Sequence, residues 1–397
     1  MKTSIAVAIG LAVMVCISLV LPASAVSIDW ITVGNAGNAN DSNGFGGVAY
    51  NYKIARSETT IAQYAEFLNA VAATDTYALY NSSMTYDANI AGIQRIGTDG
   101  NYSYTVIGSG NRPITFVSWF DAARFTNWLH NGQPTGAQNA LTTEDGAYTL
   151  LGATSGIFNK NVGATVWIPS ENEWYKAAYY DPTKNAVSGG YWMHANQSDS
   201  MTSNDPSAVG AANYYDFDYA VTQSSNYSSS QNYLTDVGAY GADSLSYYGT
   251  TDQAGNVWEW NDAVILGLQR GLRGGSWLDD FYFFGESSLR SSSRPAYGPH
   301  SENNCVGFRV ASTIHAPTSD GVGFRITSIS IRTGGSQIQL TWNSESSARY
   351  FIESSLDLAS PTWDEAATGI ISQGISTTHT FAITPGPHRF FRVAKQP

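Results

Sequence analysis

Residues 252–260 read DQAGNVWEW, and residues 273–277 read RGGSW. Trp258 and Trp260 are two positions apart, so an extended backbone would point both to one face and Glu259 to the other. Gly255, and the glycine pair within RGGSW, mark places where the backbone turns or another segment approaches closely. The alternation in residues 307–310, GFRV, is typical of a further short strand. These pieces predict a compact, loop-rich core built on short strands.

Four ordered pieces of the chain resemble one known family. GNVWEW, RGGSW, LRSSSR at residues 289–294 and GFRVA at residues 307–311 are similar to the signature of the formylglycine-generating enzyme, or sulfatase-modifying factor, superfamily. Ordered motifs at family-like spacing are more specific than a single short motif. The resemblance implies an α+β, C-type lectin-like fold with little regular secondary structure, which we place at residues 26–315.

The N-terminal residues 1–25 are typical of a secretory signal. Lys2 supplies the positive charge, residues 5–21 the apolar run, and Ala23-Ser24-Ala25 the small-residue cleavage site. A retained membrane anchor is the weaker alternative, because a single charge precedes the apolar run. We expect a secreted or extracytoplasmic protein of bacterial type, without a membrane span after signal cleavage.

Charge and cysteine content exclude several classes of function. The chain has 20 Lys and Arg against 32 Asp and Glu, a net charge of −12, whereas nucleic-acid binding requires a basic surface. Its two cysteines are Cys16, inside the expected signal, and Cys305. The mature chain would keep one thiol, which excludes an internal disulfide and a metal site made of several thiolates.

Three segments predict helices, and the C-terminal part predicts strands. Residues 58–71 repeat apolar positions at three and four, with Thr59 or Thr60 as N-cap; Ser118 caps residues 118–130, and Ser170 caps the helix within residues 166–179. After a linker at residues 313–321, strands at 324–331, 337–342, 350–354 and 388–393 predict a small all-β sandwich of the fibronectin type III kind over residues 322–397.

The resemblance also implies a calcium site beside GNVWEW. Calcium takes oxygen ligands from carboxylates and backbone carbonyls. The family's ligand positions fall here on the side chains of Asp252 and Glu259 and on the carbonyls of Gly255 and Val257. The alternative is that Asp252 is a turn residue and Glu259 a surface acid in a strand.

The family's catalytic residues are absent from this sequence. The enzyme uses two cysteines after GGS to bind copper(I), which thiolates select. Counted from Ser276 without a gap, those positions fall on Asp279 and Phe284. Copper is therefore not expected, and Cys305 is interpreted as a small buried hydrophobic residue.

The segment after RGGSW carries the predicted recognition surface. Residues 278–286 read LDDFYFFGE, with four consecutive aromatics beside two acids. Exposed apolar patches mark binding sites, and aromatic faces beside carboxylates suit a sugar or a basic peptide. We predict that Trp277, Asp279, Phe281 and Tyr282 form this surface. The alternative is that these aromatics are buried in the core.

Three functions are consistent with this sequence. The first is a non-catalytic domain that binds a peptide, a glycan or a cell-surface partner. The second is an active formylglycine-generating oxidase acting on sulfatase cysteines, and the third is a structural component of an envelope or matrix. Aldehyde formation on a sulfatase peptide separates the second from the first, and binding on glycan and peptide arrays separates the first from the third.

Overall fold

The computed structural model describes most of the chain. The described residues are 25–186, 188–200, 203–279, 288–314, 326–332, 336–344, 348–355, 364–374, 376–383 and 390–395. The expected secretory signal lies outside this set except for its last residue. None of the helices in the described ranges is long and apolar enough to cross a membrane.

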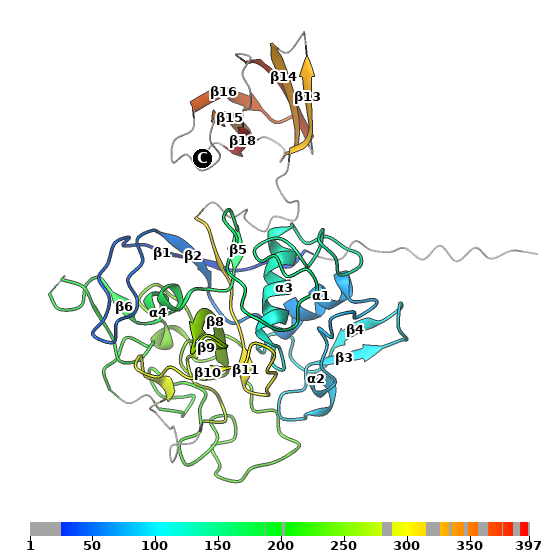
Figure 1. The fold of residues 1–397 in the computed structure, drawn as a ribbon. Helices are drawn as coiled ribbons and strands as arrows, with labels where there is room; N and C mark the ends of the chain where they lie inside the picture. The colour runs from blue at the N-terminus through cyan, green and yellow to red at the C-terminus, as the bar shows by residue number, and fades with distance from the viewer. Residues whose placement is uncertain are drawn as a thin grey trace, which may run out of the picture.

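Three of the four α-helices in the described residues begin directly after predicted capping residues, and the short α2 was not predicted. The four helices are α1 (Ile61–Val71), α2 (Ser83–Tyr86), α3 (Trp119–His130) and α4 (Glu171–Tyr179), followed by a 3₁₀ turn, η1 (Ala242–Ser244) (Figure 1). Thr60, Ser118 and Ser170 each form a capping box with the residue three positions on, which satisfies backbone N–H groups of the first turn. Of the two N-cap candidates for the first helix, Thr59 and Thr60, the structure has Thr60 as the N-cap.

Two four-stranded sheets hold the N-terminal part together. The first has the order β1 (Trp30–Val33), β2 (Tyr52–Ala55), β12 (Ala311–Ser312) and β5 (Val166–Trp167), all antiparallel. The second has the order β10 (Ala296–Tyr297), β9 (Gln269–Arg273), β8 (Trp258–Ile265) and β11 (Val306–Gly307). β11 runs parallel to β8, with Gly307 opposite Glu259. Two hairpins, β3 (Ile93–Ile96) with β4 (Ser103–Val106) and β6 (Tyr180–Asp181) with β7 (Gly190–Tyr191), complete this part.

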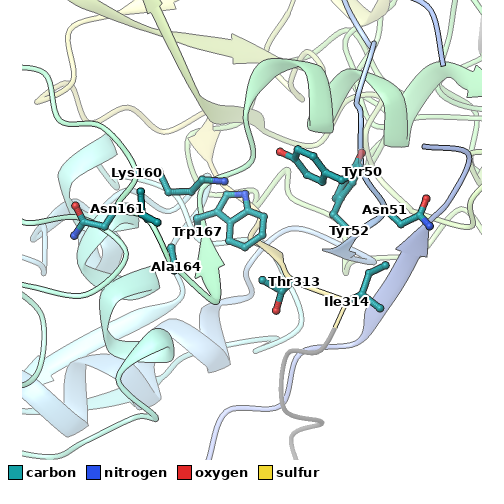
Figure 2. A pocket seen from close by; sticks show the side chains of 11 residues that line it. Tyr50, Asn51, Tyr52, Lys160, Asn161, Ala164, Trp167, Thr313 and Ile314 are labelled. Atoms are coloured by element: carbon teal, nitrogen blue, oxygen red, sulfur yellow. The ribbon is translucent and has the colours of Figure 1, made fainter. Parts of the chain in front are cut away.

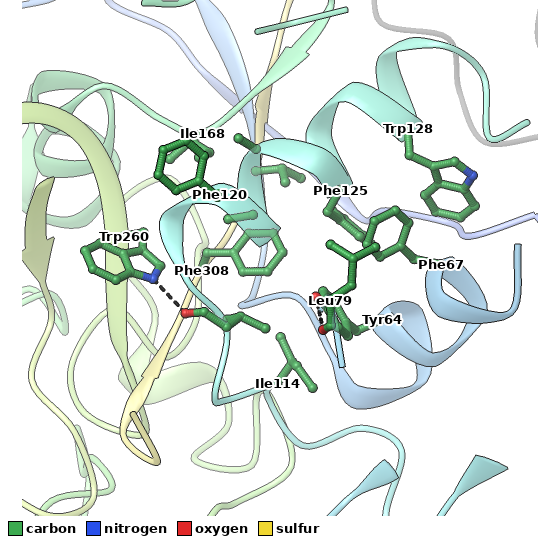
Figure 3. Packing of buried hydrophobic residues seen from close by; sticks show 14 of the residues in the cluster. Tyr64, Phe67, Leu79, Ile114, Phe120, Phe125, Trp128, Ile168, Trp260 and Phe308 are labelled. Carbon is green, nitrogen blue, oxygen red and sulfur yellow. Dashed lines mark hydrogen bonds between the residues drawn. The ribbon is translucent and has the colours of Figure 1, made fainter. Parts of the chain in front are cut away.

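The main core lies between α1, α3 and the strands of these sheets. Phe67 of α1 contacts Phe125 of α3 edge-on at 5.3 Å, and Phe125 contacts Phe308 at 5.4 Å (Figure 3). Trp260 of β8 is 0% exposed, and its indole N–H donates to the Val117 carbonyl at 2.9 Å. Burial of each such side chain stabilises the fold by about 1.5–3 kcal/mol. The short strands are therefore fixed by aromatic packing more than by their own length.

The C-terminal residues form two three-stranded sheets. One has the order β13 (Ile326–Arg332), β14 (Gln337–Asn343) and β17 (Ser376–Ala382), and the other β16 (Asp364–Ile371), β15 (Arg349–Ser355) and β18 (Phe390–Lys395). Trp342, Tyr350 and Ile352 are buried between them. The chain thus combines an α+β, C-type lectin-like part with a small all-β sandwich, which confirms the predicted fold class. β16 and β17 had no counterpart among the predicted strands.

Candidate functional site

Glu259 of β8 is the centre of the site. It faces away from its two tryptophan neighbours, as the alternation predicted, and it is 0% exposed. Arg309 donates to it twice, from Nε to Oε2 at 2.6 Å and from Nη2 to Oε1 at 2.7 Å. The indole N–H of Trp174, in α4, donates to Oε2 at 2.7 Å. The alternative of a surface acid is therefore wrong, and Glu259 joins α4, β8 and the GFRV segment.

Asp252 lies in the loop that leads into β8. Its backbone is left-handed, with φ +58°, and its Oδ2 accepts a hydrogen bond from the Gly238 amide at 2.6 Å. Burial raises the pKa of its carboxyl group. Gly255 follows at φ +82°, where a Cβ would lie 2.4 Å from the Asn213 carbonyl oxygen. Glycine is required there because two backbones meet.

Glu58 is a buried acid that the sequence analysis did not single out as a site residue. It precedes the N-cap of α1 and is 1% exposed, and no other residue donates a hydrogen bond to either carboxylate oxygen. Burial, and then the charges of Asp252 and Glu259, hold its pKa well above the ordinary range, while Arg309 opposes the shift. Glu58 therefore belongs to the same electrostatic cluster.

The RGGSW turn encloses Asp279. The Ser276 amide donates to Oδ2 of Asp279 at 2.6 Å, and the Trp258 indole N–H donates to Oδ1 at 3.2 Å. Burial raises the pKa of Asp279 to about 6. The carboxylate of this predicted surface residue thus points into the protein. Phe281, Tyr282 and Phe284 lie outside the described residues.

Trp277 is buried beneath an aromatic stack. It is 2% exposed and lies parallel to Tyr233, with ring centroids 5.2 Å apart. Tyr233 contacts Tyr219 at 4.4 Å and Tyr227 at 6.0 Å, and Tyr227 is 56% exposed. The stack therefore runs from the core to the surface. The sequence signal that could have found it is the tyrosine-rich composition of residues 213–233.

The sequence of the N-terminal part matches one family model. This model, described as the sulfatase-modifying factor enzyme 1-like domain, matches residues 47–314, more than half of the chain. The chain belongs to the sulfatase-modifying factor family. The resemblance proposed from the four sequence pieces is thereby confirmed.

Individual relatives share less with the chain. The mouse protein "Inactive C-alpha-formylglycine-generating enzyme 2" is 36% identical over 76 residues, which is 18% of this chain and 25% of that protein. The chain thus spans about a quarter of the length of the curated relative it matches. Among solved structures, CarF is 20% identical to this chain, with a TM-score of 0.39. The match covers 72% of this chain and 98% of the CarF chain. Treponema denticola variable protein 1 is 18% identical, with a TM-score of 0.42, and the match covers 72% of this chain and 94% of that protein's chain.

Among the residues that the structure describes, the cysteine is Cys305, and its thiol is free. It packs between the main core and the Trp277 cluster. Burial, and then the charge of Asp279, raise the pKa of its thiol to about 12. A thiol with this pKa is protonated at neutral pH, whereas copper(I) binding and nucleophilic attack need the thiolate.

The acidic cluster fits a calcium ion only in part. Glu259 already accepts three hydrogen bonds, so its carboxylate is largely occupied by Arg309 and Trp174. Asp252 accepts a hydrogen bond from the Gly238 amide, and Glu58 accepts none from other residues. Within the described ranges, no three or more His, Cys, Asp or Glu side chains are grouped as metal ligands. Two carboxylates and backbone carbonyls are the oxygen donors available there.

A separate open cleft has a cavity volume of about 610 Å³. Its wall includes Trp167, and the Lys160 amine lies 3.8 Å from the centre of that indole ring (Figure 2). The Tyr50 hydroxyl donates to Glu173 at 2.8 Å at the same wall. None of the predicted site residues lines this cleft. Lys160 covers one face of the indole ring, and Trp167 is 4% exposed, so the ring offers little surface on which a ligand could stack.

Proposed function

We propose that this protein is a non-catalytic member of the sulfatase-modifying factor family, secreted and binding a peptide, glycan or surface partner. The observation that carries the proposal is the identity of the residues at the two positions where the family has its copper-binding cysteines. Counted from Ser276, these positions fall on Asp279 and Phe284, and burial raises the pKa of the Cys305 thiol to about 12. Neither position supplies a thiolate, so a copper(I) ion would find no thiolate pair there.

The Asp279 side chain further supports the loss of copper chemistry. Its carboxylate oxygens accept hydrogen bonds from Ser276 and Trp258, which fix the turn where the first catalytic cysteine would lie. A carboxylate is a hard ligand and a poor match for copper(I). The name of the mouse relative, which describes that protein as inactive, agrees with this reading.

The binding role is supported by the aromatic stack over Trp277. Rings that continue from a buried tryptophan to an exposed tyrosine give a rigid apolar surface at low entropic cost. Asp216 and Asp218 lie in the same loop, beside Tyr215 and Tyr219. Aromatic faces with neighbouring acids suit the apolar face of a sugar or a cationic side chain.

Glycan and peptide arrays test the binding role. We expect a saturable ligand for the full chain, and a loss of at least ten-fold in affinity for Tyr227→Ala. Tyr247→Ala is the matched control, because Tyr247 is 39% exposed and lies outside the stack. Absence of any ligand would favour a structural component of an envelope or matrix instead. Equal affinities of the two variants would remove the stack from the proposal.

A further inference from the structure

Strand β13 of the C-terminal sandwich carries apolar side chains that no other element covers. Ile329 pairs with Leu340 of β14, and Ile331 pairs with Ile338, in an antiparallel register. Directly paired residues lie on the same face of a sheet, so both isoleucines share the face of Leu340 and Ile338. Leu340 and Ile338 are 0% and 5% exposed, whereas Ile329 and Ile331 are 60% and 71% exposed. The second sheet therefore covers β14 on this face and leaves β13 bare.

β13 is also an edge strand. Among the described strands, β14 is its one neighbour in the sheet. Natural edge strands are protected by charged side chains, by proline or by a covering segment. The seven residues of β13 include no proline, and their charged residue, Arg332, stands at the end of the strand and donates to Gln339 at 2.6 Å. An exposed apolar edge of this kind marks a surface that packs against something else.

The open cleft of the N-terminal part offers a surface of matching chemistry. Tyr50, Val162 and Ile314 line this cleft, and we call these three residues its apolar rim. Val162 is fully exposed, and Tyr50 and Ile314 are 48% and 37% exposed. A cleft of about 610 Å³ has room for several apolar side chains.

The chain itself joins the cleft to β13 (Figure 1). Thr313 and Ile314 line the cleft, and Ile326 begins β13, so the eleven residues 315–325 connect the two surfaces. A fully extended chain of this length spans about 40 Å at most. A tether of this length gives the two surfaces an effective concentration on the order of millimolar. A second copy or a free partner would have to compete with that concentration.

We propose that the bare face of β13 docks into this cleft of the same chain. Ile329 and Ile331 would pack against the apolar rim. Both surfaces are exposed in the arrangement of Figure 1, and docking would remove their apolar side chains from water. The sandwich would then take a fixed position on the sulfatase-modifying factor domain. The aromatic stack would stay free to bind a partner, because none of its residues lines the cleft.

Disulfide trapping in the full chain tests this docking. Val162→Cys/Ile331→Cys places one thiol on the rim and one on β13, and a disulfide forms when the two Cα atoms come within about 7 Å. Leu266→Cys/Ile331→Cys is the matched control, because Leu266 is 88% exposed, lies in the turn between β8 and β9, and does not line the cleft. We expect oxidised glutathione to link the first pair within one chain at least ten-fold faster than the control pair, as measured by mass spectrometry.

Ile329→Asp, added to the first cysteine pair, tests whether the apolar face drives the docking. It should slow the linkage to the rate of the control pair and leave the melting temperature unchanged, since Ile329 is 60% exposed. Equal rates for the two cysteine pairs would overturn the docking, and an unchanged rate with Ile329→Asp would overturn the role of the isoleucine face. Links between two chains, at a rate that rises with protein concentration, would identify a second copy as the occupant and contradict the proposal.

Discussion

Arg309 and Glu259 form a two-point ion pair in the interior of the protein. Their N···O distances are 2.6 and 2.7 Å, and both side chains are 0% exposed. Arg309 also donates to the carbonyls of Ala55, Arg56 and Thr251. The pair therefore ties the GFRV segment to β8, to the end of β2 and to the loop that precedes β8.

Removal of one member of this pair should strongly destabilise the fold. Glu259→Gln leaves a buried guanidinium without its counter-charge, so we expect a loss of about 3–5 kcal/mol in the free energy of unfolding. Asp29→Asn is the control, since Asp29 is 67% exposed in its pair with Arg56, and should cost at most about 1 kcal/mol. Urea denaturation measures both, and equal effects would contradict the interior role.

Gly255 should tolerate no side chain. Gly255→Ala combines a left-handed backbone with a Cβ 2.4 Å from the Asn213 carbonyl oxygen. Gly267→Ala is the matched control, with φ +72° and no atom within 4 Å of the added Cβ. The control should lose about 1–2 kcal/mol from backbone strain, and Gly255→Ala about 1–3 kcal/mol more from the overlap. Equal unfolding midpoints would show that the loop relaxes freely.

Asp121 should make stability depend on pH. Burial, and then the charge of Glu302, raise the pKa of this capping residue from 3.8 to about 7, against the hydrogen bonds of Ser118 and the charge of Arg124. Because the folded pKa is the higher one, the contribution of Asp121 is fully present below about pH 3.8 and is lost as pH rises toward 7.

The Asp121→Asn variant isolates this contribution. Between pH 4.5 and 7 the wild type should lose up to about 1.4 kcal/mol per pH unit relative to the variant. Urea denaturation across this range provides the comparison. Parallel pH profiles for the two proteins would mean that Asp121 titrates as it does in the unfolded chain.

Cys305 should be unreactive in the folded protein. With a pKa of about 12, its thiol is almost entirely protonated at pH 8. Iodoacetamide at pH 8 should leave Cys305 unmodified in the native protein and alkylate it in urea, as read by mass spectrometry. Alkylation of the native protein at the rate of a free thiol would contradict the burial argument.

Local sequence patterns predicted the helices well because capping is local. Ser118 and Ser170 cap helices within residues that the sequence itself specifies. The strands β16 and β17 were missed because their registers depend on pairing with β15 and β14, and because β16 begins with exposed acids. Pairing partners set such strands more than their own composition does.

The sequence predicted those residues of the candidate site that lie within one local motif, and it missed those that tertiary packing brings to the site. The motif located Asp252 and Glu259, which the fold brings into one electrostatic cluster. Glu58 lies far from both in sequence, and a polar residue before a helix looks like an ordinary exposed acid. Tertiary packing buries Glu58, pairs Glu259 with Arg309 and places the tyrosines over Trp277. The periodicity of the sequence does not encode these contacts.

The central claim is that this family member does not make formylglycine. Its most direct test is to incubate the purified full chain with copper(I), oxygen and a peptide carrying the CxPxR sulfatase motif, and to measure aldehyde by mass spectrometry. We predict that the peptide cysteine stays unchanged, as in a protein-free control. Aldehyde formation that requires the folded protein would contradict the account.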